Sequence, residues 1–296
     1  MANLGLVYKS LMDDDFKVLN AIERGLRRRE YVPLEIIERY SGLHEEKITL
    51  ILSKLHSLKL VKRKTISGKF AYRLTYTGYD MLAFKALVDA NVFEAIGDKI
   101  GVGKESEIYI GLAPGGVYLA VKIFRIGRTS FRKTARTRKW SIEGRHSWYE
   151  QSKIAAEREY KALRELAYLN AYVPVPIGYN RHVVVTEFID GVELCKKPSL
   201  NNPEQVLTKV LETLAIAYHK ASIVHGDLSE YNILVRRSDE TPFIIDWPQY
   251  VYRDEPNAFE LLKRDVYYIT RFFRKTYGVD LDYNEAFKRV VEWERK

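Results

Sequence analysis

The sequence lacks the features that mark secreted and membrane proteins. Its 296 residues contain a single cysteine, Cys195, so no intrachain disulfide can form and no cysteine cluster can bind zinc. No apolar run approaches the roughly 18 residues of a membrane span, and no N-terminal apolar stretch precedes a cleavage site. These absences predict a cytoplasmic protein without a membrane partner, in which Cys195 is a small packing residue.

Acidic residues are outnumbered by basic ones. The chain has 48 Lys and Arg against 39 Asp and Glu, which gives a net charge of +9 and a pI near 9.3. A polyanionic partner is therefore plausible on charge alone. Hydrophobic residues make up 46% of the chain, as in ordinary globular proteins, and the length is sufficient for two domains.

The first ninety residues predict helices and one β-hairpin. Apolar residues recur at helical spacing, as in Phe16, Leu19 and Ile22, and Ser67-Gly68 separates two β-rich runs. The predicted helices lie at about 13–28, 34–40, 44–59 and 77–89, and the strands at 60–66 and 69–75. This order is typical of a winged helix-turn-helix, in which the third helix faces a nucleic-acid groove and the hairpin is the wing.

The charges of this region favour contact with phosphates over sequence reading. The predicted wing carries Lys62, Arg63, Lys64 and Lys69. The polar face of the third helix is mixed in sign and lacks a run of the side chains that read base edges. We therefore favour non-sequence-specific contact with nucleic acid or protein over operator recognition, although protein docking alone remains an alternative.

A short polar loop and the strand after it carry the residues of a phosphoryl-transfer site. His225-Gly226-Asp227-Leu228-Ser229-Glu230-Tyr231-Asn232 is followed by Ile244-Ile245-Asp246-Trp247. Phosphoryl transfer from ATP requires a carboxylate that orients the attacking hydroxyl, and an Asn and a second carboxylate that hold Mg²⁺. Asp227, Asn232 and Asp246 have the order and spacing for these roles.

A glycine-containing turn and a strand lysine precede that loop. Strands are predicted at 93–100, 107–112 and 117–124, and the first turn is Gly101-Val102-Gly103-Lys104-Glu105-Ser106. Its glycines allow backbone N–H groups to approach phosphates, although the spacing is not that of a Walker loop. Lys122 follows at the position of the kinase lysine that pairs with phosphates and with a helix glutamate.

Two further predictions complete the nucleotide site. Glu159 is the favoured helix glutamate, with Glu157 or a solvated carboxylate as alternatives. The backbone of Glu187 and Ile189, after an apolar strand, is expected to meet the adenine edge.

The segment from Arg125 to Arg145 is unusually basic. It contains eight Lys or Arg against one acid, and Phe131 and Trp140 lie among the charges. Such a segment is suited to an RNA backbone, with stacking by the rings. A surface loop without a fixed partner is the alternative.

Together these motifs resemble the RIO family of atypical protein kinases, in its winged-helix-bearing Rio two subfamily. The resemblance covers nearly the whole chain and includes the loop at 225–232, the turn at 101–106 and Ile-Ile-Asp-Trp-Pro-Gln at 244–249. It implies an α+β chain, with a winged helix-turn-helix at 1–90 and a trimmed bilobal kinase domain at 91–296. The lobes would be about 91–186 and 190–296, as in a compact archaeal-type member.

The resemblance also implies roles for individual residues. Asp227 would be the catalytic aspartate, Asn232 and Asp246 the ligands of Mg²⁺ or Mn²⁺, and Lys122 the lysine that pairs with ATP phosphates. Ser106 and the turn before it would touch phosphates, and Asp246 would accept the γ-phosphoryl group transiently. The implied biology is late maturation of the small ribosomal subunit, with a pre-small-subunit particle or rRNA as partner.

Departures from ordinary protein kinases favour ATP hydrolysis over protein phosphorylation. Gly226 replaces the arginine that reads a phosphorylated activation loop, and Pro248 replaces a flexible glycine. Little chain follows Asp246, so the helices that hold a peptide substrate are not expected and a protein substrate stays unassigned. Asp265 opens a late predicted helix, where it either braces the catalytic loop or caps the helix.

Two other classes of protein fit parts of the pattern. Small-molecule phosphotransferases of the aminoglycoside or choline type share the His-Gly-Asp loop, but usually have a second His where this chain has Ser229-Glu230-Tyr231. The second alternative is a DNA-binding regulator whose kinase lobe only senses ATP. Sequence-specific duplex binding by residues 1–90 would support it.

Overall fold

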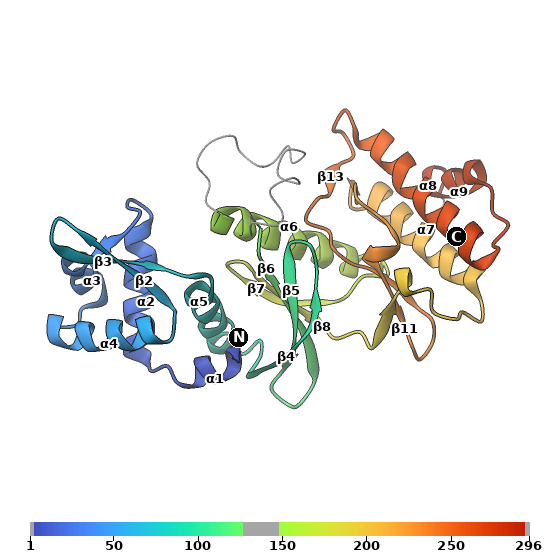
Figure 1. Cartoon of the computed structure of the whole chain (residues 1–296). Coiled ribbons are helices and arrows are strands. Elements are labelled where there is room, and N and C mark those ends of the chain that lie inside the picture. Colours follow the sequence, from blue (N-terminus) through green and yellow to red (C-terminus); the bar gives the residue numbers. More distant parts are fainter. Residues whose placement is uncertain (1–2, 127–147, 294–296) are drawn as a thin grey trace. The chain divides into compact units, whose positions relative to one another are not determined.

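The computed structural model describes residues 3–126 and 148–293 (Figure 1). Backbone contacts divide the chain into two compact units, one of residues 1–102 and 108–123 and the other of residues 103–107 and 124–296. Within the described ranges, no helix combines the length and the apolarity that a membrane crossing requires. The predicted division at residue 90 stays a prediction.

The N-terminal unit begins with helices around a small antiparallel sheet. Its elements are α1 (Leu4–Lys9), α2 (Asp13–Leu26), β1 (Val32–Pro33), α3 (Leu34–Ser41), α4 (Glu45–Ser57), β2 (Val61–Ile66), β3 (Lys69–Leu74) and α5 (Tyr76–Asp89). The sheet order is β1-β3-β2. The predicted order of three helices, hairpin and helix is confirmed. The short α1 and β1 were not predicted, and Pro33 is the N-cap residue of α3.

The hairpin turn follows from its two central residues. Ser67 and Gly68 have φ values of 48° and 78°, and positive φ at both central positions matches the twist of the flanking strands. The register runs from Val61 opposite Leu74 to Ile66 opposite Lys69. Val61 is buried while the rest of β2 is exposed, so the basic wing residues on β2 face solvent.

Helical apolar spacing forms the core of this region. Leu19 and Ile22 of α2, Ile37 of α3, and Ile48 and Leu55 of α4 are each 0% exposed. Because these residues recur every three or four positions, each helix turns one apolar stripe inward. The unit continues with β4 (Ala95–Val102), β5 (Ser106–Leu112) and β6 (Tyr118–Phe124), which are neighbours in that order.

The C-terminal unit combines a long helix, short strands and a helical bundle. Its elements are α6 (Trp148–Tyr168), β7 (Pro176–Asn180), β8 (Val183–Glu187), β9 (Gly191–Glu193), η3 (Leu194–Lys196), α7 (Pro203–His219), β10 (Ile223–Val224), η4 (Glu230–Asn232), β11 (Ile233–Arg236), β12 (Pro242–Ile244), β13 (Val251–Tyr252), α8 (Ala258–Tyr277) and α9 (Tyr283–Val291). Strands β12, β11 and β9 form one antiparallel sheet, and β10 pairs with β13.

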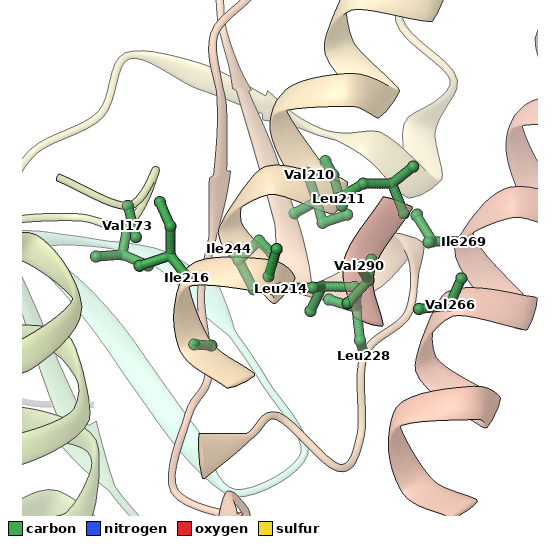
Figure 2. Close-up of a cluster of buried hydrophobic side chains, with 14 of the residues drawn as sticks. Val173, Val210, Leu211, Leu214, Ile216, Leu228, Ile244, Val266, Ile269 and Val290 are labelled. Atoms are coloured by element: carbon green, nitrogen blue, oxygen red, sulfur yellow. The ribbon is translucent and has the colours of Figure 1, made fainter. Parts of the chain in front are cut away.

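One apolar cluster supports both sides of the polar loop. Leu228, the residue after Asp227, is 2% exposed, and Ile244, at the end of β12, is 0% exposed. Figure 2 shows them in a cluster with Leu214 of α7, Val266 of α8 and Val290 of α9. The polar loop and the strand before Asp246 are therefore anchored in the same core.

Candidate active site

The loop between β10 and β11 carries two of the predicted site residues. Asp227 is exposed, and Asn232 ends η4 with its side chain half-buried. Asn232 Nδ2 donates to the backbone oxygen of Asp227 at 2.9 Å. This bond uses the amide nitrogen, so Oδ1 of Asn232 is the atom that remains for a cation.

Asp246 is tied to the same loop through the backbone. The Ile245 N–H donates to the backbone oxygen of Asn232 at 2.9 Å. Asp246 itself has a φ of 67°, a left-handed conformation that is uncommon for a residue with a side chain and occurs at functional sites. One backbone hydrogen bond thus links the two predicted cation ligands.

Buried His225 connects Asp227 to the strand that precedes Asp246. Its Nε2 lies 3.1 Å from the backbone oxygen of Ile245, and its Nδ1 accepts the Asp227 N–H at 3.3 Å. Because Nδ1 accepts a hydrogen bond, Nε2 is the ring nitrogen that donates to the Ile245 oxygen. Trp247, 0% exposed, packs against the ring with centroids 4.6 Å apart. His225 was not predicted to have a role, although its position beside Gly226-Asp227 was a signal.

Asp265 holds the backbone on both sides of Asp227. Its carboxylate accepts the Gly226 N–H at 2.7 Å and the Leu228 N–H at 3.1 Å, on either side of Asp227. The residue lies inside α8, whose N-cap is Asn257, so the expectation that it opens a helix was wrong and capping is not its role. Burial raises the pKa of Asp265, against the lowering effects of His225 and the two N–H groups.

Arg158 forms a second link to the segment around Asp246, and this link was not predicted from the sequence. This residue of α6 donates from Nε to the backbone oxygen of Pro248 at 2.9 Å, and from Nη2 to the backbone oxygen of Tyr250. Its guanidinium lies 4.1 Å from the centroid of the Tyr250 ring. Helix α6 is therefore fastened to the segment that follows Asp246. No sequence signal beyond its position next to Glu159 pointed to it.

The structure distinguishes the two candidate glutamates on α6. Glu159 is 3% exposed, whereas the half-exposed Glu157 pairs with Lys161 one turn later at 2.6 Å. Glu159 is thus the carboxylate on the inner face of the helix. Lys122 lies on β6, between Val121 and Ile123, which are both 0% exposed.

The glycine-containing turn is shorter than expected. Gly101 and Val102 are the last residues of β4, and β5 begins at Ser106. The Gly103 N–H donates to the backbone oxygen of Ser106 at 2.9 Å, so this N–H is already occupied. Ser106 is 8% exposed. Phosphate contact by Val102, Lys104, Glu105 and Ser106 stays a prediction.

The end of β8 and the segment after it supply one hydrogen-bond acceptor and one hydrogen-bond donor from the backbone, at Glu187 and Ile189. The Glu187 N–H donates to the Val175 oxygen at 2.9 Å, and the Glu187 oxygen accepts the Thr186 hydroxyl at 3.0 Å. The Ile189 N–H has no hydrogen-bond partner within the described residues. A carbonyl oxygen and an N–H two residues apart can receive the donor and acceptor of an adenine edge.

The basic segment predicted for RNA contact needs one correction. Arg125 is 3% exposed, and its Nε pairs with Glu107 at 3.0 Å. Its charge is therefore compensated inside the protein, and it does not belong to an RNA-binding surface. Residues 127–147, which include the rest of the basic segment, lie outside the described residues.

The basic residues of the winged region fall into two groups. On α4, Lys47 pairs with Asp14 and Lys54 pairs with Asp15 at 2.5 Å, so both cations are compensated by α2. On the wing, Lys62, Arg63 and Lys64 are exposed. This distribution weakens the operator-reading alternative, because the helix expected in the groove has its lysines bound to aspartates.

The side-chain oxygens of Asn232 and Asp246 fit a magnesium ion that is also bound by phosphates. Among the described residues, no three His, Cys, Asp or Glu side chains gather as a metal site. Asn232 and Asp246 supply two oxygen donors, and Mg²⁺ in phosphoryl-transfer sites is commonly bound by one or two protein carboxylates plus substrate phosphates.

Both the N-terminal and the C-terminal parts of the chain match known protein families. Residues 8–90 match the family described as "Rio2, N-terminal", and residues 107–286 match the "RIO domain". The chain is 34% identical to the RIO-type serine/threonine-protein kinase Rio2 of Methanocaldococcus jannaschii, over 90% of this chain and 100% of that one. It is 35% identical to rio2 of Schizosaccharomyces pombe, over 94% and 80%.

Other relatives extend this result. RIO2 of Caenorhabditis elegans is 35% identical over 97% of this chain, which spans about half (53%) of that relative's length. The crystal structure of a Chaetomium thermophilum Rio2 kinase-ADP/Mg²⁺-phosphoaspartate complex matches with a TM-score of 0.81 and 31% identity, over 96% of this chain and 88% of that one. The predicted fold class, a winged helix followed by a RIO kinase domain, is confirmed. The chain belongs to the Rio2 serine/threonine-protein kinases of the RIO family.

Proposed function

We propose that the protein binds Mg-ATP and transfers or hydrolyses its γ-phosphoryl group. The observation that carries this proposal is the hydrogen-bonded set of Asp227, Asn232 and Asp246, in which Asn232 bonds to Asp227 and to the residue before Asp246. The related Chaetomium thermophilum Rio2 kinase was solved as a complex with ADP and Mg²⁺, which supports Mg-ATP as the bound species.

Each residue of the set has a distinct task. Asn232 Oδ1 and the Asp246 carboxylate hold the cation, which neutralises charge on the transferred group. The exposed Asp227 carboxylate orients the attacking hydroxyl or water. Lys122 pairs with phosphates, Glu159 holds that lysine, and the Glu187 oxygen and Ile189 N–H meet the adenine.

ATP hydrolysis through an aspartyl-phosphate is our preferred reaction. An Asp246 oxygen would form a bond to the γ-phosphorus as the bond to the β-phosphate oxygen breaks, and water would then release phosphate. The phosphoaspartate named for the related kinase supports this route.

The partner we propose is rRNA or a pre-small-subunit ribosomal particle, in the cytoplasm. A net charge of +9 and the exposed cations Lys62, Arg63 and Lys64 on the wing support contact with a phosphate backbone. Because such binding releases counterions, we expect it to weaken steeply as salt is raised. Purification with nuclease-sensitive small-subunit rRNA would support this partner, and nuclease-insensitive association with proteins alone would contradict it.

The catalytic proposal is tested with two substitutions. We expect Asp227→Ala and Asp246→Ala each to abolish ATP turnover, and Asp246→Ala also to weaken Mg-ATP binding measured by calorimetry. Asp254→Ala, at an exposed position after β13, is the matched control and should turn over ATP normally. Undiminished turnover in either site variant would refute the assignment.

A further inference from the structure

A pocket lies beside the loop that joins β10 and β11, in residues that the proposed active site does not use. It has a volume of about 470 Å³ and is lined by Lys197, Glu230, Tyr268, Arg271, Phe272, Lys275 and Thr276. All of these residues belong to the C-terminal unit. Glu230 lies in η4, between Asp227 and Asn232 in sequence, so the pocket adjoins the loop that carries them.

The pocket has two walls that are fixed to each other. Residues 268, 271, 272, 275 and 276 recur at helical spacing and form one stripe of α8. The other wall consists of Lys197, which follows η3, and Glu230 of η4. The Tyr277 hydroxyl donates to the backbone oxygen of Pro198 at 3.0 Å, which fastens the end of α8 to the segment that carries Lys197.

The charges in this pocket are not compensated by the protein. Within the described part of the chain, Lys197, Arg271 and Lys275 form no ion pair with any carboxylate, and Glu230 pairs with no cation. Elsewhere on α8, Lys263 pairs with Glu260 at 2.8 Å. Arg271 and Lys275 are also like charges four residues apart, which is unfavourable unless an anion lies between them. The pocket therefore has the charge of an anion site.

The aromatic lining indicates what carries the anion. Tyr268 is 48% exposed, and Phe272 also lines the pocket. An exposed ring beside cations is the combination that stacks a base and holds the adjoining phosphate in single-stranded nucleic acids. Glu230 can accept hydrogen bonds from a ribose hydroxyl or a base amine. That carboxylate also disfavours a phosphomonoester dianion, so a phosphopeptide fits less well than a phosphodiester.

We propose that this pocket binds a nucleotide unit of single-stranded RNA. The site is separate from the residues assigned to ATP and stands whether or not the ATP assignment does. The cations hold the phosphodiester, Tyr268 stacks on the base, and Glu230 accepts from the ribose or base.

The test uses the full chain and a fluorescein-labelled single-stranded RNA of about 12 nucleotides, within the usual site sizes. Fluorescence anisotropy gives the Kd at several salt concentrations. The pocket variant is Arg271→Gln/Lys275→Gln. The control, Lys263→Gln/Arg274→Gln, removes the same charge from cations of α8 that are paired with Glu260 and Asp280. A third variant, Tyr268→Leu, removes the stacking ring and keeps the charge. Thermal melting confirms that each variant is folded.

We expect the pocket variant to bind about 10-fold more weakly and to reduce the slope of log Kd against log salt by about 0.7, the contribution of one lost phosphate contact on a single strand. Tyr268→Leu should weaken binding several-fold without changing the slope, and the control should stay within about twofold of the parent. Equal losses in the pocket and control variants, or no effect of Tyr268→Leu, would overturn the proposal. A phosphoserine peptide that binds through Arg271 and Lys275 while RNA binding is unaffected would also overturn it.

Discussion

Asp265 receives the Gly226 N–H at 2.7 Å, and its second carboxylate oxygen receives the Leu228 N–H at 3.1 Å. The buried carboxylate thus fixes the backbone on both sides of Asp227. Asp265 is therefore a positioning residue.

We expect Asp265→Asn to lower kcat for ATP by about 10- to 100-fold, because a small misplacement of a catalytic group has effects of this order. The amide can accept only one of the two N–H groups well. The KM for ATP should change much less, and steady-state kinetics separate the two effects. Asp280→Asn is the control, since the Asp280 side chain is 98% exposed. Parallel changes in kcat and KM would contradict a role in positioning Asp227.

The parent protein and its Asp265→Asn variant should also differ in how their stability depends on pH. The raised pKa of Asp265 means that the folded state binds this proton more tightly than the unfolded state, whose Asp pKa is about 3.9. This contribution to stability is fully present below about pH 3.9 and is lost as the pH rises through the folded-state pKa. The difference in unfolding free energy between the parent and Asp265→Asn should therefore be larger at low pH than at neutral pH. Denaturant titrations measure it, and a difference that grows with pH would contradict the raised pKa.

Leu228 couples the catalytic loop to the core. Its side chain is 2% exposed and lies in the cluster shown in Figure 2. We expect Leu228→Ala to reduce the free energy of unfolding by about 2–5 kcal/mol through lost burial and the cavity it leaves. Leu50→Ala provides the contrast, because Leu50 is 74% exposed and its loss should cost little. Similar effects of both substitutions on the urea midpoint would be inconsistent with this packing.

Arg158 should affect turnover through the segment after Asp246. Arg158→Lys keeps the charge but cannot reproduce the paired donation to the Pro248 and Tyr250 oxygens. We expect kcat to fall several-fold. Arg164→Lys, at an exposed position on the same helix, should leave kcat unchanged. If both variants matched the parent enzyme, the link between α6 and this segment would have no catalytic role.

Much of the N-terminal region could be predicted because its signals are local. Helical apolar spacing placed α2 and α4, and the Ser67-Gly68 turn placed the hairpin. The two-residue β1 was missed because its pairing with Ala71 and Tyr72 depends on residues far along the chain.

The predictions for Arg125 and Asp265 were wrong because both charged side chains are buried in the folded protein. Arg125 looked like the start of an exposed basic surface, yet it is buried against Glu107. Asp265 looked like the beginning of a helix, yet α8 begins at Ala258 and Asp265 lies inside it. Charge in a sequence does not show where its partner is.

The sequence by itself was sufficient to predict the chemistry proposed for this protein, because Asp227, Asn232 and Asp246 are recognised by residue type, order and spacing. Only the tertiary structure decided how that set is held. The bonds from His225 to Ile245, from Arg158 to Pro248 and from Gly226 and Leu228 to Asp265 join residues 20 to 90 positions apart. Such contacts form only when the chain folds, and no local pattern announces them.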